Sequence, residues 1–101
     1  MNMLEVLEEI IHQRCSQPNE TSYTSQLFAA GSSKIAQKVG EEAVEVVVAA
    51  LSQSREAQIN ELADLFFHVF VLMRQINITL DDVNAELERR HLDRSRLGDD
   101  R

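Results

Sequence analysis

The sequence predicts an all-α fold, a bundle of four to five helices, and three observations support this prediction. The 101 residues include only three Gly and one Pro, few of the residues that shape the tight turns of a β protein. Ala, Leu, Glu, Gln and Arg, which favour helices, are abundant. Apolar residues recur three and four positions apart over most of the chain, as they do on one face of a helix. With 44% hydrophobic residues, the chain can bury the core of one small domain.

The first part of the chain is divided by a loop of turn-forming residues. Residues 2–15 have the apolar spacing of a helix, and 16–22, which read SQPNETS, form the loop. A short helix is expected in YTSQLFAAG, where Gly31 ends it. Ser32 or Ser33 is expected to cap the helix that follows.

Two long helices and a shorter one complete the expected bundle. Segment 33–52 is amphipathic, with its Lys and Glu residues opposite an apolar face. After a tight break, 55–76 becomes apolar nearly all round in LFFHVFVLM, which is typical of a helix buried on more than one side. In a domain this small, such burial indicates a partner subunit. Thr79 and Asp82 resemble a capping box at the start of a last helix, 79–91.

Composition narrows the possible functions. A net charge of −7 and a pI near 4.8 argue against non-specific binding to nucleic acid, which needs a basic surface. The single Cys15 excludes an intramolecular disulfide and a Cys-based zinc site, and it fits a cytoplasmic protein. We expect no signal peptide or membrane span, because acidic residues interrupt the apolar pattern of 1–16 and no apolar run is long enough. The expected organisation is one domain, 1–92, followed by a polar C-terminal tail, 93–101.

Acidic residues form two groups on consecutive helices. They are Glu41, Glu42 and Glu45 in KVGEEAVEVV, and Glu61 and Asp64 in ELADLFFH. A short turn joins the two helices, so antiparallel packing could bring the groups face to face, where the carboxylates would repel one another. A divalent cation removes that repulsion, and all-oxygen ligands favour Mg²⁺, with Mn²⁺ as the alternative. A Glu-rich stripe is more often a solvated face, but the second group lies on a segment otherwise too apolar to be exposed.

Two lysines precede the first acidic group on the same helix. Lys38 and Lys34 lie about one and two turns before Glu42. They could bind the phosphate oxygens of a substrate beside the metal. The alternative is ordinary pairing of lysine and glutamate four residues apart on an exposed helix.

These residues resemble a known family. KIAQKVGEEAVEVV followed by ELADLFFHVFVLM, with SYTSQLF upstream and ELERRH downstream, is similar to the phosphoribosyl-ATP pyrophosphohydrolase family of histidine biosynthesis. The likeness covers about 4–92. The sequence also fits the wider all-α nucleotide pyrophosphohydrolase superfamily. The signature of that superfamily is E-E-x-x-E, followed further along the chain by E-x-x-D.

The resemblance implies a fold, a reaction and a ligand set. The fold would be a helical bundle completed by oligomerisation, as a homodimer or, alternatively, a tetramer. Phosphoribosyl-ATP would be hydrolysed with Mg²⁺ to phosphoribosyl-AMP and pyrophosphate, the second step of L-histidine biosynthesis. By motif position the metal ligands would be Glu42, Glu45, Glu61 and Asp64. Glu41 would either support these ligands or orient the attacking water, and Glu41, Glu42 and Glu45 form the expected catalytic group.

Further substrate contacts are suggested by the same likeness. Ser22, Tyr23 and Thr24 match the SYT segment, although they could simply cap a short helix. Arg89, in a basic cluster late in the last helix, could reach the substrate from a neighbouring subunit or merely complement the helix C-terminus. His68 is either a group supporting the metal site or a core histidine.

Three alternatives remain open from the sequence. A broader nucleoside-triphosphate pyrophosphohydrolase with a house-cleaning role would use the same acids. A carboxylate-bridged di-iron bundle would use the E-x-x-H pairs, Glu9 with His12 and Glu88 with His91. A helical interaction module without catalytic activity would use none of them.

Overall fold

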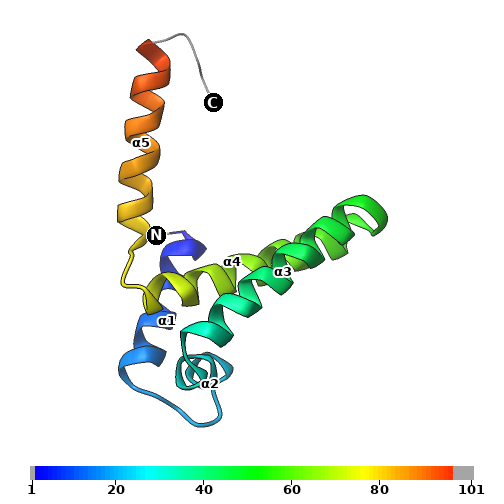
Figure 1. Cartoon of the computed structure of the whole chain (residues 1–101), viewed down its shortest axis with the longest axis vertical. Helices are drawn as coiled ribbons and strands as arrows, with labels where there is room; N and C mark the ends of the chain where they lie inside the picture. Colours follow the sequence, from blue (N-terminus) through cyan, green and yellow to red (C-terminus); the bar gives the residue numbers. More distant parts are fainter. Residues whose placement is uncertain (1, 97–101) are drawn as a thin grey trace.

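The structure, a computed structural model, describes the backbone of residues 2–96 and the side chains of residues 2–93 (Figure 1). The described residues form five α-helices and no strand, which confirms the predicted all-α fold. In chain order these helices are α1 (Met3–Ser16), α2 (Tyr23–Ala30), α3 (Ser32–Ser52), α4 (Arg55–Gln75) and α5 (Leu80–Arg96).

The short helix expected in YTSQLFAAG is α2, and Gly31 ends it as predicted. Gly31 has a φ of 93°, a backbone conformation that glycine adopts without steric cost. The prediction that Ser32 or Ser33 caps the next helix is wrong, because α3 begins directly after Gly31 without a side-chain cap. The hydroxyl of Ser32 instead accepts a hydrogen bond from Gln75 Nε2 at 2.8 Å, which joins the start of α3 to the end of α4.

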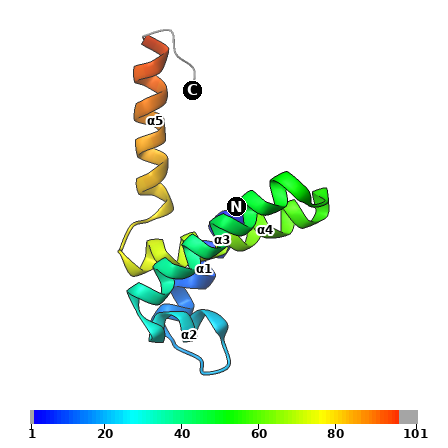
Figure 2. The ribbon, with the colours of Figure 1, turned by 45° about the vertical axis from the view of Figure 1, so that its right-hand side comes forward.

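Helices α3 and α4 form a long antiparallel hairpin and make the most extensive helix–helix contact of the structure (Figures 1 and 2). Ser54 caps α4 by accepting a hydrogen bond from the Ala57 backbone N–H at 3.2 Å. Gln58 Nε2 donates to the carbonyl oxygens of Ala49 and Gln53, at 3.1 and 3.2 Å, and so closes the turn. The turn therefore sets which residues of α3 face which residues of α4.

The hydrophobic core lies where α1 and α2 pack against one end of this hairpin. Its buried side chains come from the first four helices and are Ile11, Leu27, Ile35, Phe70 and Val71. The other end of the hairpin projects away from the core (Figures 1 and 2). Its exposed apolar residues recur at helical spacing and form what we call the hairpin apolar face: Val44, Val47, Val48 and Leu51 on α3, and Ile59, Leu62 and Phe66 on α4.

Helix α5 stands apart from the rest of the chain (Figures 1 and 2). The capping box expected at its start is confirmed: Thr79 N–H donates to Asp82 Oδ2 at 2.9 Å, and Asp82 N–H donates to Thr79 Oγ1 at 3.1 Å. Its first residue is held by Glu8, whose Oε2 accepts from the Leu80 backbone N–H at 2.6 Å. Beyond that point α5 packs extensively against none of the other described helices. It continues to Arg96, into the segment expected to be a polar tail; the domain boundary itself stays a prediction.

No single helix in residues 2–96 has the length and apolar character needed to cross a membrane. Within the same described range, α4 taken together with Leu80–Asp93 meets that test of length and composition, and the two are bent by 103°.

Candidate active site

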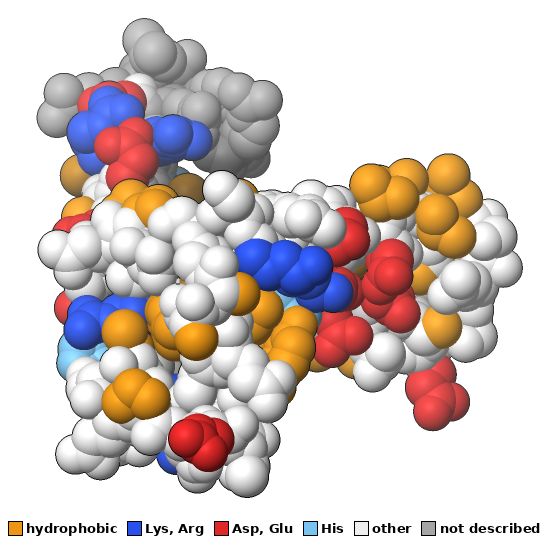
Figure 3. Space-filling view, turned by 60° about the horizontal axis from the view of Figure 1, so that its bottom comes forward, with side chains coloured by type: hydrophobic (Ala, Val, Ile, Leu, Met, Phe, Trp, Pro, Cys, Tyr) orange, Lys and Arg blue, Asp and Glu red, His pale blue; other side chains and the backbone are white. Residues whose placement is uncertain are grey.

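The hairpin brings three carboxylates together. Glu42 and Glu45 are three residues apart on α3, so they share a face, and antiparallel packing sets Glu61 of α4 opposite them. One carboxylate oxygen from each of the three lies within 4.8 Å of the others. Figure 3 shows acidic side chains gathered next to basic ones on this side of the molecule. We call Glu42, Glu45 and Glu61 the carboxylate cluster.

The cluster is partly buried and incompletely neutralised. Glu42 is only 7% exposed, although the helical pattern had suggested a place on the polar side of its helix. The Oε2 atoms of Glu42 and Glu61 are buried, and neither has a hydrogen-bond partner. Burying a charged oxygen without a partner is unfavourable, so such an arrangement persists when something positive compensates it. Glu45 is exposed and opens the cluster to solvent.

These features fit a hard divalent cation. The donors are all carboxylate oxygens, the type that Mg²⁺ and Mn²⁺ prefer. Mg²⁺ usually keeps several of its waters and binds only a few protein carboxylates, which suits a cluster open on one side. The two unpartnered oxygens are the atoms that a cation would satisfy.

A lysine accompanies the cluster. Lys38 Nζ lies 3.5 Å from Glu42 Oε1, one turn away on α3, and its side chain is 26% exposed. Desolvation lowers the pKa of Lys38, but Tyr23, Glu41 and Glu42 together outweigh it and raise this pKa above its ordinary value. Lys38 is therefore a persistent ammonium group at the edge of the cluster. Lys34, one turn earlier, is exposed.

Two of the acids expected at the site lie outside the cluster. Glu41 is exposed, and its Oε1 accepts a hydrogen bond from Gln37 Nε2 at 3.4 Å. Asp64 lies about one turn after Glu61 on α4 and is also exposed. The structure thus brings together three of the four expected ligands, and the roles assigned to all of them stay predictions.

A histidine that sequence analysis left ambiguous is bonded at both ring nitrogens. His68, on α4, is 6% exposed. Its Nδ1 lies 2.7 Å from the carbonyl oxygen of Asp64, and its Nε2 lies 2.9 Å from the hydroxyl of Tyr23. The rings of Tyr23 and His68 also each contact Phe67, with centroids 6.0 and 5.0 Å apart. This link between α2 and α4 spans 45 residues of sequence, and no local pattern indicated it.

The three residues of the SYT segment have different environments. Ser22 caps α2, since its Oγ accepts from the Ser25 N–H at 3.2 Å, and Thr24 is buried. Tyr23 is 48% exposed, so its side chain is the one of the three most accessible to a substrate.

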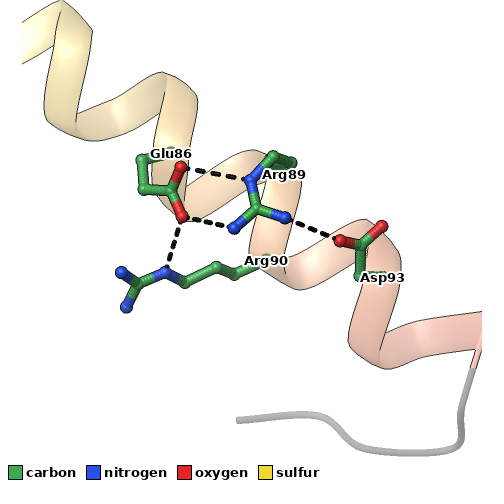
Figure 4. Close-up of polar contacts among 4 residues, drawn as sticks. All are labelled: Glu86, Arg89, Arg90 and Asp93. Atoms are coloured by element: carbon green, nitrogen blue, oxygen red, sulfur yellow. Dashed lines mark hydrogen bonds and ion pairs between the residues drawn. The ribbon is translucent and has the colours of Figure 1, made fainter.

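Arg89 belongs to an ion-pair network on α5 (Figure 4). It bonds Glu86 through Nε at 3.1 Å and Nη2 at 2.6 Å, and it bonds Asp93 through Nη1 at 2.8 Å. Arg90 Nε also donates to Glu86, at 2.8 Å. These bonds lower the pKa of Glu86 to about 2. Because α5 stands apart from the hairpin, a contact between Arg89 and a substrate in the cluster would have to come from another copy of the chain.

The E-x-x-H pairs of the di-iron alternative lie on α1 and α5. In the part of the chain whose side chains are described, neither pair joins a group of three or more potential ligands. The structure therefore offers this alternative no metal centre among the described residues.

The fold and site together define an all-α domain with a candidate divalent-cation site in a helical hairpin. The chain belongs to the phosphoribosyl-ATP pyrophosphohydrolase family, whose model matches residues 4–91, and the family predicted from the sequence is thereby confirmed. It is 51% identical to the phosphoribosyl-ATP pyrophosphatase of Pyrobaculum aerophilum, over 87% of this chain and 94% of the relative. The phosphoribosyl-ATP pyrophosphatase of Metallosphaera sedula is also 51% identical, over 88% of this chain and 96% of the relative. That of Bacillus mycoides is 41% identical, over 99% of this chain and 94% of the relative.

Proposed function

We propose that this protein hydrolyses phosphoribosyl-ATP between its α and β phosphates, yielding phosphoribosyl-AMP and pyrophosphate, the second step of L-histidine biosynthesis. The observation that carries the proposal is the convergence of Glu42, Glu45 and Glu61 in a chain whose family match, residues 4–91, includes both acidic segments. The relatives named above carry the name of this activity.

The proposed cofactor is Mg²⁺, with Mn²⁺ as the alternative. The two buried, unpartnered oxygens of Glu42 and Glu61 support this choice, and exposed Glu45 would share the ion. Asp64 is retained as a fourth ligand because its exposed side chain can change rotamer without disturbing the core. When bound, the cation would supply positive charge that stabilises the charge developing on the phosphates.

The residues around the cluster have separate proposed tasks. Lys38, with Lys34 behind it, binds phosphate oxygens, and the ion pair with Glu42 keeps the Lys38 ammonium group close to the place where they arrive. Glu41, solvent-exposed next to Glu42, orients the attacking water and accepts its proton. Tyr23 contacts the substrate from α2.

We also propose a homodimer, with a tetramer as the alternative assembly. The hairpin apolar face supports this, since Leu51 is 83% exposed and Val44 62%. An apolar surface of this kind is costly to leave in water and is typical of protein interfaces. We further propose that, in this assembly, Arg89 of one copy contacts a substrate in the neighbouring cluster. A cytoplasmic location is proposed from the biosynthetic role and the single cysteine.

The test is to incubate the purified protein with phosphoribosyl-ATP and Mg²⁺ and to identify the products by mass spectrometry. Phosphoribosyl-AMP and pyrophosphate are expected, and Glu61→Gln should lose most of the activity. Glu56→Gln is the matched control, because Glu56 is an exposed glutamate on the same helix, outside the cluster. Equal pyrophosphate release from a panel of nucleoside triphosphates would favour the house-cleaning alternative. An absence of metal-dependent hydrolysis of any nucleotide would refute the enzymatic proposal and favour an interaction module.

A further inference from the structure

The aromatic ring of Tyr23 is held in place at the start of α2. Its hydroxyl lies 2.9 Å from His68 Nε2, and its ring stacks on that of Phe67, with the two centroids 6.0 Å apart and the planes inclined by 26°. The ring of His68 meets the Tyr23 ring edge-on, with centroids 5.8 Å apart. His68 is itself buried and bonded to the backbone of α4. Two ring contacts and a hydrogen bond therefore fix the orientation of the Tyr23 ring.

The same side chain is open to solvent where Phe67 and His68 do not cover it. Tyr23 is 48% exposed, whereas His68, which anchors it, is 6% exposed. A rigid aromatic ring with an open side is a surface on which the flat ring of a nucleobase can stack. Because the ring is already oriented, stacking on it does not cost the conformational freedom that a mobile side chain would lose.

The position of the ring relative to the carboxylate cluster suits a nucleotide. Glu61 and His68 are seven residues apart on α4, nearly two turns, so they share a face of the helix and lie about 10 Å apart along its axis. Tyr23 is bonded to His68 and therefore lies at a comparable distance from the cluster. In a nucleotide, the ribose and the first phosphate separate the base from the scissile bond by a span of this order. Figure 3 shows hydrophobic side chains beside the acidic and basic ones on this side of the molecule.

We propose that the ring of Tyr23 is the platform on which the purine ring of the nucleotide stacks, while its phosphates bind at the carboxylate cluster. The proposal rests on the proposed function, because it takes the substrate to be a nucleotide whose scissile phosphates lie at the cluster. It assigns the substrate contact of Tyr23 to the face of the ring rather than to the hydroxyl, which is already bonded to His68. His68 and Phe67 are then positioning residues, because they orient the ring without touching the substrate.

The chain itself provides an optical readout of this contact. Tyr23 is the only tyrosine and the sequence has no tryptophan, so tyrosine fluorescence reports on this ring alone. Phosphoribosyl-AMP, titrated into the full chain with Mg²⁺, should quench the fluorescence in a saturable manner. N-acetyltyrosinamide in the same solutions is the control for light that the purine absorbs. Inorganic pyrophosphate with Mg²⁺ has no base, so it should bind, as isothermal titration calorimetry will show, without quenching.

Two substitutions of Tyr23 separate the ring from the hydroxyl. Tyr23→Leu removes the ring, so KM for phosphoribosyl-ATP should rise roughly tenfold, the effect of losing one base-stacking interaction, with a smaller change in kcat. Tyr23→Phe keeps the ring and loses only the bond to His68, so KM should rise much less, about twofold. The Kd of pyrophosphate should be the same in both variants as in the wild type, because the phosphates bind elsewhere.

Ser25→Ala is the control for a loosened α2. Ser25 Oγ accepts from the Asn19 N–H at 3.0 Å and donates to the Arg14 carbonyl oxygen at 3.2 Å, so it anchors this helix without contacting the Tyr23 ring. The variant should lower Tm and leave KM unchanged. Light scattering on every variant measures whether the assembly of the wild type is retained.

Each outcome decides for or against the platform. A KM rise in Tyr23→Phe as large as that in Tyr23→Leu would overturn it in favour of the hydroxyl. Bound phosphoribosyl-AMP that leaves the fluorescence unquenched would overturn it, as would an altered assembly in Tyr23→Leu, which would make Tyr23 an interface residue. If the wild type does not hydrolyse phosphoribosyl-ATP, the proposed reaction fails, and the fluorescence decides alone: quenching by phosphoribosyl-AMP but not by pyrophosphate supports the platform, and any other result overturns it too.

Discussion

Glu61→Gln should stabilise the protein in the absence of divalent metal and abolish most of the stabilisation that Mg²⁺ provides. The buried Oε2 of Glu61 has no hydrogen-bond partner, and a carboxylate oxygen of each of Glu42 and Glu45 lies within 4.8 Å. Glutamine removes the charge at nearly constant volume. Its amide N–H₂ can also donate to a neighbouring carboxylate, which the native side chain cannot do when ionised.

The magnitude follows from these separations. Two like charges 4.8 Å apart repel by about 1 kcal/mol at the dielectric constant of water and by about 3.5 kcal/mol at an effective value near 20. Lys38 offsets part of this through its ion pair with Glu42, and exposed Glu45 can turn away into solvent. We therefore expect a net stabilisation of about 1–2 kcal/mol, which for a domain of this size raises Tm by roughly 5–10 °C.

The assay is a set of thermal melts in EDTA and in saturating Mg²⁺, with NaCl added to equal ionic strength. In EDTA, Glu61→Gln should melt above the wild type. Mg²⁺ should stabilise the wild type by about 2.7 kcal/mol at 100 times its Kd, and the variant by much less. Glu56→Gln, the matched control in the first turn of α4, should melt at or slightly below the wild type in EDTA, because it loses a favourable charge at a helix N-terminus.

Equal stabilisation of wild type and Glu61→Gln by Mg²⁺ would refute the reasoning, since these carboxylates would then not be the ion's ligands. A variant that melts no higher than the wild type in EDTA would show that the cluster is not under electrostatic repulsion.

Three further predictions concern the lysine, the other acids and α5. Glu42→Gln and Glu45→Gln should each reduce turnover by ~10²-fold or more, and the effects should be far from additive in the double variant. Steady-state kinetics at saturating Mg²⁺ check this. Near-normal turnover in both single variants would show that these residues do not belong to the site. Lys38→Ala should raise KM more than it lowers kcat, and Lys38→Gln should behave alike because only the charge matters; unchanged kinetics would leave Lys38 as an ordinary surface residue. Glu86 has a folded pKa lowered from 4.5 to about 2, so its stabilising effect should be complete above pH 4.5 and disappear as the pH falls towards 2. Helicity followed by circular dichroism over that range should fall less in Glu86→Gln than in the wild type, and identical curves would contradict the prediction.

The helices and some of their ends were predictable because they depend on neighbours in sequence, although the cap expected at Ser32 or Ser33 was wrong. Apolar spacing indicated the helices, and Gly31 and the Thr79–Asp82 pair marked two of the boundaries. The burial of Glu42 was not predictable in this way. A helical periodicity assigns Glu42 to the polar side of α3, and only the register of the α3–α4 hairpin, closed by Gln58, shows that this side faces Glu61.

The Tyr23–His68 bond and the direction of α5 were hidden for different reasons. The bond joins residues 45 positions apart, and nothing in either local sequence marks the other as its partner. For α5, a capping box specifies where a helix starts but not where it points, and α5 packs extensively against none of the other described helices. The residues of the hairpin apolar face, which we propose as an interface, show by their pattern that they are apolar, but the sequence does not show what would cover them.

The proposed cation site would combine two structural requirements that oppose each other, and the hairpin reconciles them. A cation site needs several carboxylates close together, which destabilises the chain that holds them. Here the carboxylates lie between two helices of 21 residues each, which are joined by a capped turn and packed along their length. The packing restrains the two helices, so the repulsion between the carboxylates cannot easily push the helices apart. Lys38 neutralises one carboxylate before any substrate arrives, and it leaves the Oε2 atoms of Glu42 and Glu61 unsatisfied. The buried oxygens lose their water when the protein folds, and the hairpin fixes their positions before any ion arrives. A bound cation would therefore not have to supply the free energy for these two steps.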